Sequence, residues 1–301
     1  IGDAGAAREL SEATRNVAML TGLDPRGIMD AIGNAQANFS ALANATDRAT
    51  YLNRVLPMLA QAAVASNSSL EDMVNAAGEY TRQLNISGQD MPRAIAQAIA
   101  EGRLGSIGFK DVAGHMGVVA GAASRTISST PEDSLRSRAL VGTLFQFAGR
   151  AGGSGDEAAT RARAFFDNLS SGRGQKALRE GLGYNAFDAT GQIARRQGET
   201  QVDAFQRVVQ DAYRRSGGNS TRFLDTIAGA NTRSRTLGDQ LFRDLRAHGG
   251  RLTDFRGIID QSMNATEGDA VGQPFRAITG TEANARARRE VREFYGLTGD
   301  S

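Results

Sequence analysis

Residues 66–111 read SNSSLEDMVNAAGEYTRQLNISGQDMPRAIAQAIAEGRLGSIGFKD, and this stretch decides the fold class of the chain. Ser68 precedes Glu71 by three residues, and Ser87 precedes Asp90 by the same interval. A hydroxyl and a carboxylate at that spacing satisfy the free amide groups at the start of a helix. Apolar residues at helical spacing follow each serine, and each run closes on a polar or glycine-containing turn. The stretch therefore predicts two short, capped, amphipathic helices.

Helix signals continue on the N-terminal side of this stretch. Asp24 and Pro25 place a cap before a proline, at the helical position where the missing N–H costs nothing. Apolar residues from Leu52 to Ala63 form a stripe at helical spacing. Pro57 interrupts that stripe, so we expect a kink or a fresh helix start near Asn53.

The strongest helix start lies on the C-terminal side, at Thr130-Pro131-Glu132-Asp133, where a cap and a proline precede two acids. It predicts a helix over residues 135–148 that is apolar nearly all round and should be the most buried. Ser154 and Glu157 predict the start of the next helix. Further helical periodicity covers residues 202–212, 223–227, 237–245, 255–259 and 282–295.

Strand signals are nearly absent, so the predicted fold class is all-α, an irregular bundle of many short helices. Residues 181–198, GLGYNAFDATGQIARRQG, break the helical pattern and predict a small non-helical, hairpin-like excursion. We expect one helical subdomain over residues 1–126 and a second over 130–262 that packs on it. Residues 263–301 are expected to form a loosely attached tail. Because the sequence starts at Ile1, we also expect it to be a piece of a longer protein.

Composition favours a folded protein without redox or membrane-spanning elements. Of 301 residues, 40% are hydrophobic and 23% charged, which is usual for a globular chain with a core. There is no cysteine, which excludes disulfides and thiolate metal sites. The longest small and apolar run, Val112 to Ala123, is too short to span a bilayer.

The net charge is only +2, although all 35 basic residues except Lys110 and Lys176 are arginine. Arginine suits phosphate contacts, but a GC-rich genome explains the same bias. The arginines alternate with acids, so the sequence shows no concentrated nucleic-acid footprint, and we predict no sequence-specific nucleic-acid binding.

No constellation of catalytic residues is recognisable, and we predict no catalytic, cofactor-binding or metal-ligating residue. The acid pairs each fall in the first turn of a predicted helix, where a carboxylate complements the helix dipole: Glu71/Asp72, Glu132/Asp133 and Asp156/Glu157. His248 is expected at a helix C-terminus, and His115 is expected to be a hydrogen-bonded core or groove residue. The glycine cluster at residues 149–155 lacks the lysine of a phosphate loop and is predicted to be a linker.

The order of several phrases along the chain resembles the globular core region of phage tail tape-measure proteins. The LNISGQDM and EGRLGSIGFKDV turns come first. GSGDEAATRARAFFDNLSS, KALREGLGYNAFDATGQI and QVDAFQRVVQDA follow in that order. The resemblance covers about Thr46 to Asp260, and the two ends of the chain match less clearly.

The resemblance implies a structural protein of a phage or phage-like particle, held in the tail interior of the virion after assembly in the host cytoplasm. Such proteins determine tail length and take part in tail assembly and genome ejection. Expected partners are the tail tube, the tail tip, assembly chaperones and further copies of the chain, with no cofactor. A molecular ruler needs a long extended helix. Glycine and proline interrupt this chain at short intervals, so we expect a compact module attached to the ruler.

Two other functions remain open from the sequence. The first is a membrane-active ejection or pore module, which would contact the host membrane by exposing helices such as Val112 to Ala123. Gly117 and Gly121 form a small-residue face there, which tight packing in a helical bundle explains better than membrane insertion. The second is a peptidoglycan-cleaving enzyme. The lack of a catalytic motif favours a non-enzymatic role.

Overall fold

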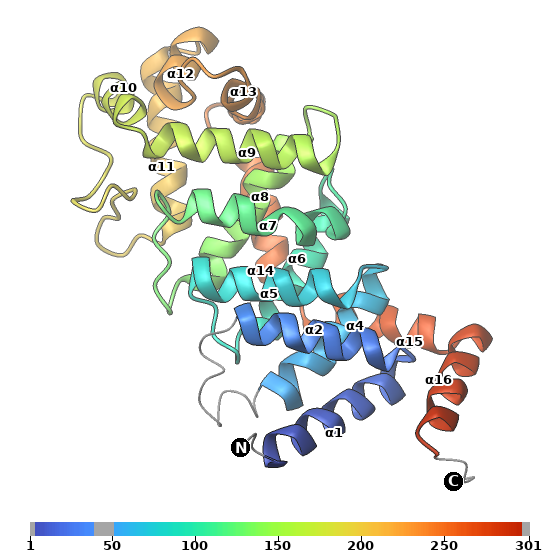
Figure 1. Ribbon diagram of the computed structural model, residues 1–301. Helices are drawn as coiled ribbons and strands as arrows, with labels where there is room; N and C mark the ends of the chain where they lie inside the picture. Colours follow the sequence, from blue (N-terminus) through green and yellow to red (C-terminus); the bar gives the residue numbers. More distant parts are fainter. Residues whose placement is uncertain (1–3, 39–50, 297–301) are drawn as a thin grey trace.

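The computed structural model describes residues 4–38 and 51–296, and this part of the chain is an all-α bundle (Figure 1). It contains one isolated antiparallel bridge, between Phe187 and Ile193, and no sheet. The predicted fold class is confirmed. In chain order the elements are α1 (Ala4–Thr21), α2 (Pro25–Asn38), the π-helical turn η2 (Tyr51–Val55), α4 (Leu56–Ser66), α5 (Leu70–Leu84), α6 (Met91–Leu104), α7 (Phe109–Ala123), α8 (Ser134–Gly149), α9 (Gly155–Ser170), α10 (Gly172–Leu182), α11 (Gln201–Ser216), α12 (Ser220–Ile227), α13 (Thr232–Ala247), α14 (Thr253–Met263), the π-helical turn η3 (Gly268–Gly272), α15 (Gln273–Thr279) and α16 (Glu282–Phe294).

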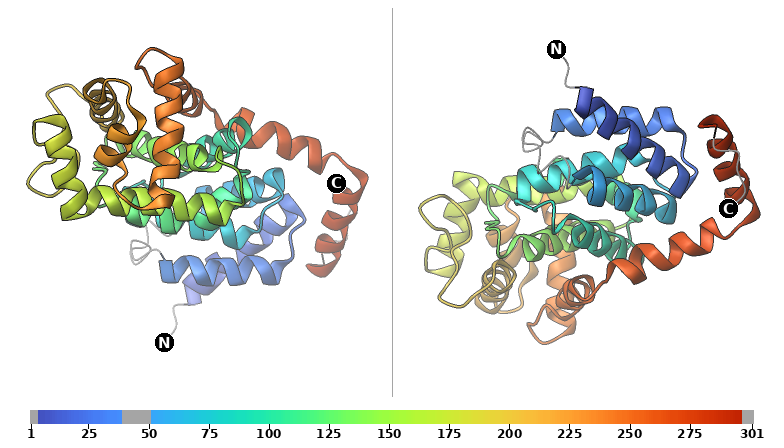
Figure 2. Two further views of the ribbon diagram at one scale, coloured as in Figure 1. Left: turned by 90° about the horizontal axis from the view of Figure 1, so that it is seen from above. Right: turned by 90° about the horizontal axis from the view of Figure 1, so that it is seen from below.

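The helices form a front row with a second group behind it. α2, α5, α7 and α9 lie side by side in Figure 1, each in contact with the next, and α13 packs on α9. Behind this row, α6, α8 and α14 pack on one another. Figure 2 shows that α1 and α2 lie at the same end of the molecule as α16, which packs on α1.

Helix α8 runs through the centre of the bundle and is buried along nearly its whole length. It contacts α6, α7, α9, α11, α13 and α14, so solvent reaches it only in its first turn, where Arg136 is exposed. This confirms the prediction that residues 135–148 form the most buried helix. The reason is visible in the sequence, because a helix that is apolar all round has no polar stripe to expose.

The predicted cap of α5 was wrong by one residue. Ser69, not Ser68, caps this helix by accepting a hydrogen bond from Asp72 N at 3.0 Å. Ser68 N instead donates to Ala63 O at 2.9 Å and helps to close α4, whose C-cap Asn67 has a left-handed φ of 53°. Ser68, the residue predicted to cap α5, therefore belongs to the C-terminal end of α4.

The serine predicted to cap α6 instead closes the turn before it, because α6 begins at Met91 with Asp90 at its N-cap and no side-chain cap hydrogen bond. Ser87 Oγ accepts from Asp90 N at 3.1 Å and donates to Asp90 Oδ2 at 2.7 Å.

The predicted start of α8 at Thr130-Pro131 was also wrong. These residues form a turn in which Asp133 N donates to Thr130 O at 3.0 Å, and the helix begins only at Ser134. The Asp133 carboxylate does not cap α8. Its Oδ2 accepts from the backbone N of Gln201 at 2.8 Å, at the start of α11. The pair Glu132/Asp133 thus precedes a helix instead of lying in its first turn, because a tertiary contact competes for the carboxylate.

Other local predictions hold with small shifts of boundary. Pro57 lies in the first turn of α4, directly after the π-helical turn, so a fresh helix starts at Leu56 rather than near Asn53. Pro25 opens α2, and Ser154 caps α9 through Glu157 N at 3.3 Å. The excursion predicted for residues 181–198 begins at 183, because α10 continues through Leu182.

The glycine face of α7 allows close packing on α5. A Cβ at Gly117 would lie 2.8 Å from Glu79 Cγ, which is too close for a real side chain. α7 lies between α5 and α9, with Val118 as its large exposed apolar side chain. Among the described helices, none has both the length and the apolarity needed to cross a membrane.

The division at residues 126–130 and 262–263 stays a prediction, although several contacts cross these boundaries. α7 packs on α8 and α9, and α14 packs on α6. The segment after α14 returns to the N-terminal helices: Arg93 Nη2 donates to Met263 O at 3.2 Å, and Arg103 Nη2 donates to Ala270 O at 2.9 Å.

Candidate functional site

Residues 183–200 form the longest irregular segment in the described second half of the chain, and they are held in a defined conformation. Gly183 ends α10 with φ +70°. Asp188 Oδ1 then accepts from Thr190 N at 2.8 Å, Thr190 Oγ1 at 2.6 Å and Gln192 N at 3.1 Å, which closes a tight turn. The flanking Phe187 and Ile193 are buried, so the tip is exposed while both of its arms are anchored.

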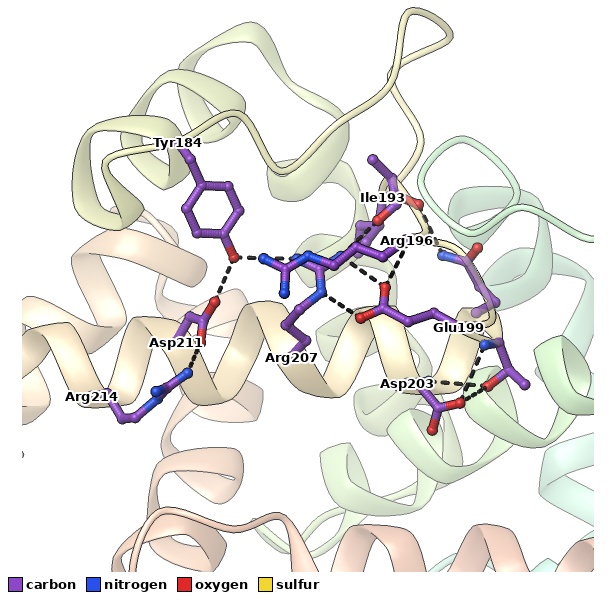
Figure 3. Close-up of polar contacts among 11 residues, drawn as sticks. Tyr184, Ile193, Arg196, Glu199, Asp203, Arg207, Asp211 and Arg214 are labelled. Atoms are coloured by element: carbon purple, nitrogen blue, oxygen red, sulfur yellow. Dashed lines mark hydrogen bonds and ion pairs between the residues drawn. The ribbon is translucent and has the colours of Figure 1, made fainter.

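Arg207 on α11 fastens this segment from below (Figure 3). Its Nη2 donates to Ala194 O at 2.7 Å, and its Nε donates to Glu199 Oε1 at 2.8 Å. Its Nη1 donates to the Tyr184 hydroxyl at 3.3 Å, which in turn donates to Asp211 Oδ2 at 2.7 Å. One arginine thereby joins both ends of the segment to a single helix.

This arrangement is better suited to binding a partner than to transferring protons. Burial tends to raise the pKa of Glu199, but the Arg207 guanidinium lowers it below its ordinary value, so the carboxylate stays charged. Asp211 is buried and engaged by Tyr184 and Arg214. A loop held rigidly on a helical scaffold is a common place for recognition. The sequence predicted the excursion, but not Arg207, which carries no local signal inside an amphipathic helix.

A second polar network is completely buried between α6 and α8. Arg138 Nη2 lies 2.6 Å from Glu101 Oε1, and both side chains have no exposed surface. Gln97 Oε1 accepts from Arg138 Nε at 3.2 Å, and Ser262 Oγ on α14 accepts from Arg138 Nη2 at 2.9 Å. Burial raises the pKa of Glu101, while Arg138 acts in the opposite direction. The Arg138 guanidinium also lies 5.9 Å from the Tyr80 ring centroid.

This pair was not predicted from the sequence, although an arginine inside an otherwise apolar helix is a signal of a buried ion pair. A buried ion pair links helices in a defined register, and it has no route to a substrate at the surface. We therefore assign it to the architecture of the bundle.

A third cluster joins α13 to α14 around His248. As predicted, His248 lies at the C-terminal end of a helix, where its Nδ1 is 3.0 Å from Asp244 O and 2.8 Å from Asp244 Oδ1. Asp244 also accepts from Asp254 N at 3.1 Å and Phe255 N at 3.0 Å. Asp244, His248 and Asp254 offer metal-ligand atoms within 4.8 Å of one another. Because Asp244 is already satisfied within the chain, we interpret the cluster as a cap that joins two helices.

The His248 cap should make stability depend on pH. Hydrogen bonds from His248 to the backbone and carboxylate of Asp244 raise its pKa above 6.5. The stabilisation is therefore complete below the unfolded pKa and is lost as the pH rises through the folded one. We expect His248→Gln to reduce the free energy of unfolding more at about pH 6 than at about pH 8. Urea denaturation at both pH values measures this difference.

An NMR titration checks the same prediction directly. His115→Gln leaves His248 as the single histidine signal, which assigns the resonance. A titration midpoint for His248 at or below 6.5 would contradict the cap.

His115 lies at a groove, as predicted. The groove has a volume of about 580 Å³ and runs along α9 between α7 and the start of α13. His115 Nε2 lies 3.4 Å from Asp156 Oδ1, and Arg163 and Arg233 also line the groove. Asp156 belongs to the first turn of α9, as Glu71 and Asp72 belong to that of α5, so both pairs lie where the sequence placed them.

Comparison with known proteins identifies one family. The family described as phage-related minor tail protein matches residues 6–239, which extend from α1 into α13. The match includes the segment held by Arg207 and the buried pair of Arg138 and Glu101. Comparisons with curated proteins and with solved structures found no match.

Proposed function

Since the chain belongs to the family of phage-related minor tail proteins, we propose that it is a non-enzymatic structural module of a tail tape-measure protein. The observation that carries this proposal is the family match over residues 6–239, together with the order of sequence phrases that resemble the tape-measure core. The family supports a role in a virion tail, and the finer assignment rests on the resemblance.

The shape of the helices supports a module beside a ruler. The longest described helix, α1, has 18 residues, which corresponds to about 27 Å at the usual rise. Helices of this length fold back on one another here, so adding residues to this part would not extend it in proportion. In the proposal the module acts in tail assembly and genome ejection, and tail length is set by extended helix elsewhere in the protein.

The proposed partners are other tail components: the tube, the tip, assembly chaperones and further copies of the same protein. The proposed location is the tail interior. The exposed tip at residues 188–190 is the surface we assign to such contacts, because the network around Arg207 fixes its conformation before binding.

Deletion in the intact particle tests the proposal. We expect that removing the codons of this module blocks tail assembly or genome ejection, and that lengthening helical sequence outside it changes tail length in proportion. Electron microscopy of tails and plaque counts measure both outcomes. Tails of normal length and normal infectivity without the module would refute the assignment.

Two biochemical assays on the purified chain test the alternatives. Leakage of dye from liposomes would favour a membrane-active ejection module, and a cleared zone in a peptidoglycan zymogram would favour an enzyme. We expect neither.

A further inference from the structure

One end of the molecule carries exposed arginines whose charges no described carboxylate balances. This end consists of α10, α11 and α12, which all contact one another and lie far from α1 and α16 (Figure 1). Arg179 lies in the last turn of α10, Arg215 in the last turn of α11, and Arg222 in the first turn of α12. All three are exposed, and none forms an ion pair with another residue that the structure describes.

The packing of the three helices brings these arginines together. A Cβ at Gly183 would lie 2.9 Å from Arg215 Nη1, so this guanidinium covers the end of α10. Arg179 O accepts from Gly183 N at 2.8 Å, one turn away.

α12 crosses α10 close to the same point. Gly181 faces Thr226, because a Cβ at Gly181 would lie 3.1 Å from Thr226 Cβ. Thr226 Oγ1 donates to Arg222 O at 2.8 Å, so Arg222 is one turn from the crossing. The backbones of Arg179 and Arg222 and the guanidinium of Arg215 thus all lie within about one helical turn of the C-terminal end of α10 or of its crossing with α12.

Each described acid of α10, α11 and α12 pairs with a basic residue other than these three arginines, Asp203 with Arg256 at 2.9 Å. Glu180 pairs with Lys176 at 3.8 Å, and Asp225 pairs with Arg235 at 2.6 Å. Asp211 is buried and pairs with Arg214. The positive charge of the three exposed arginines is therefore not neutralised locally.

Stabilisation of the helix ends does not account for all three. A cation in the last turn complements the helix dipole, which explains Arg179 and Arg215 in part. Arg222 is in the first turn of its helix, where a positive charge is unfavourable. Helix stabilisation therefore does not explain Arg222. Binding of an anion from outside the protein explains all three arginines.

The geometry points to sequence-independent binding of the phosphate backbone of a double-stranded nucleic acid at this surface. An acidic protein is the other class of anionic partner, but protein interfaces have an apolar centre. The large exposed apolar side chains of the described residues lie on other helices: Leu20, Met29, Leu104, Val118, Ile278 and Phe294. A polar, positively charged surface without them is typical of contact with a duplex.

Fluorescence anisotropy with the full chain and labelled duplexes of two unrelated sequences tests this inference. We expect equal affinity for both duplexes and a logarithm of affinity that falls linearly with the logarithm of salt concentration. The variant R179Q/R215Q/R222Q should bind about tenfold more weakly or worse, with a salt slope smaller by about 3.

A matched variant distinguishes the effect of this surface from the effect of the net charge of the protein. R8Q/R246Q/R289Q removes three exposed arginines elsewhere and changes the net charge equally. It should leave the affinity within about twofold, because it removes no phosphate contact. Equal losses in both triple variants, or no salt-dependent binding of the wild type, would overturn the inference. Tighter binding of polyglutamate than of duplex would assign the surface to an acidic protein and also overturn it. Far-UV circular dichroism confirms that each variant is folded.

Discussion

Replacing Arg138 with alanine is expected to destabilise the folded protein by about 3–5 kcal/mol. The substitution leaves Glu101 without its counter-ion in a site with no exposed surface. It also removes the donors to Gln97 and Ser262, so α8 loses its polar contacts with α6 and α14. Urea denaturation followed by circular dichroism measures the loss.

Two further variants decide whether the unpaired charge is the cause. In Arg138→Met/Glu101→Leu both charges are replaced by apolar groups, so most of the stability should return. Arg136→Ala removes an exposed arginine from the same helix and should cost less than about 1 kcal/mol. A double variant as unstable as Arg138→Ala would show that packing, not charge, dominates the loss.

The Arg138→Ala variant should also have a distinct pH dependence. Burial raises the pKa of Glu101, and the variant lacks the guanidinium that opposes this. The folded pKa then exceeds the unfolded one, so the folded state binds the proton more tightly. The loss of stability relative to the wild type should therefore shrink as the pH falls toward 4.5, and a loss that does not change with pH would contradict this account.

Gly142→Ala is expected to cost about 3 kcal/mol, at the upper end of the usual range for overpacking. A Cβ at this position of α8 would overlap Glu101 Oε2 and lie 2.9 Å from the carboxyl carbon. The carboxylate cannot move aside, because Arg138 and Ser262 hold it. Thermal unfolding measures the change.

Gly114→Ala is the matched control, since nothing lies within 4 Å of a Cβ at this position in α7. Alanine is the better helix former, so the control should gain up to about 1 kcal/mol. If both substitutions stabilise the protein, the site around Glu101 is more adaptable than its contacts indicate.

The sequence predicted most of the secondary structure because helix starts and ends depend on neighbouring residues. Ser154 capped α9 and Pro25 opened α2 as expected, and Ser87 bonded to Asp90 at the predicted spacing but in the turn before α6. The predicted caps were wrong where another helix, adjacent or distant in the sequence, bonds to the same residue. Ser68 was taken by the end of α4, and Asp133 was taken by the start of α11.

The candidate site was predicted only as a break in the helical pattern. The tight turn at Asp188 depends on residues two and four positions away, and it was recognisable as a turn from glycine and aspartate. Its attachment to Arg207 was not recognisable, because an arginine on an amphipathic helix usually faces solvent.

By itself, the sequence determined that this protein is a bundle of short capped helices, because capping, periodicity and glycine or proline breaks act over a few residues. Only the tertiary structure decided which polar groups meet. Asp133 and Gln201 are 68 residues apart, and Arg138 and Glu101 are 37 apart. Arg179, Arg215 and Arg222 likewise lie at one end of the molecule only in the folded chain, where the nearby acids pair with other basic residues. No local pattern encodes such pairings, because their energies depend on burial and on distances that exist only once the helices have packed.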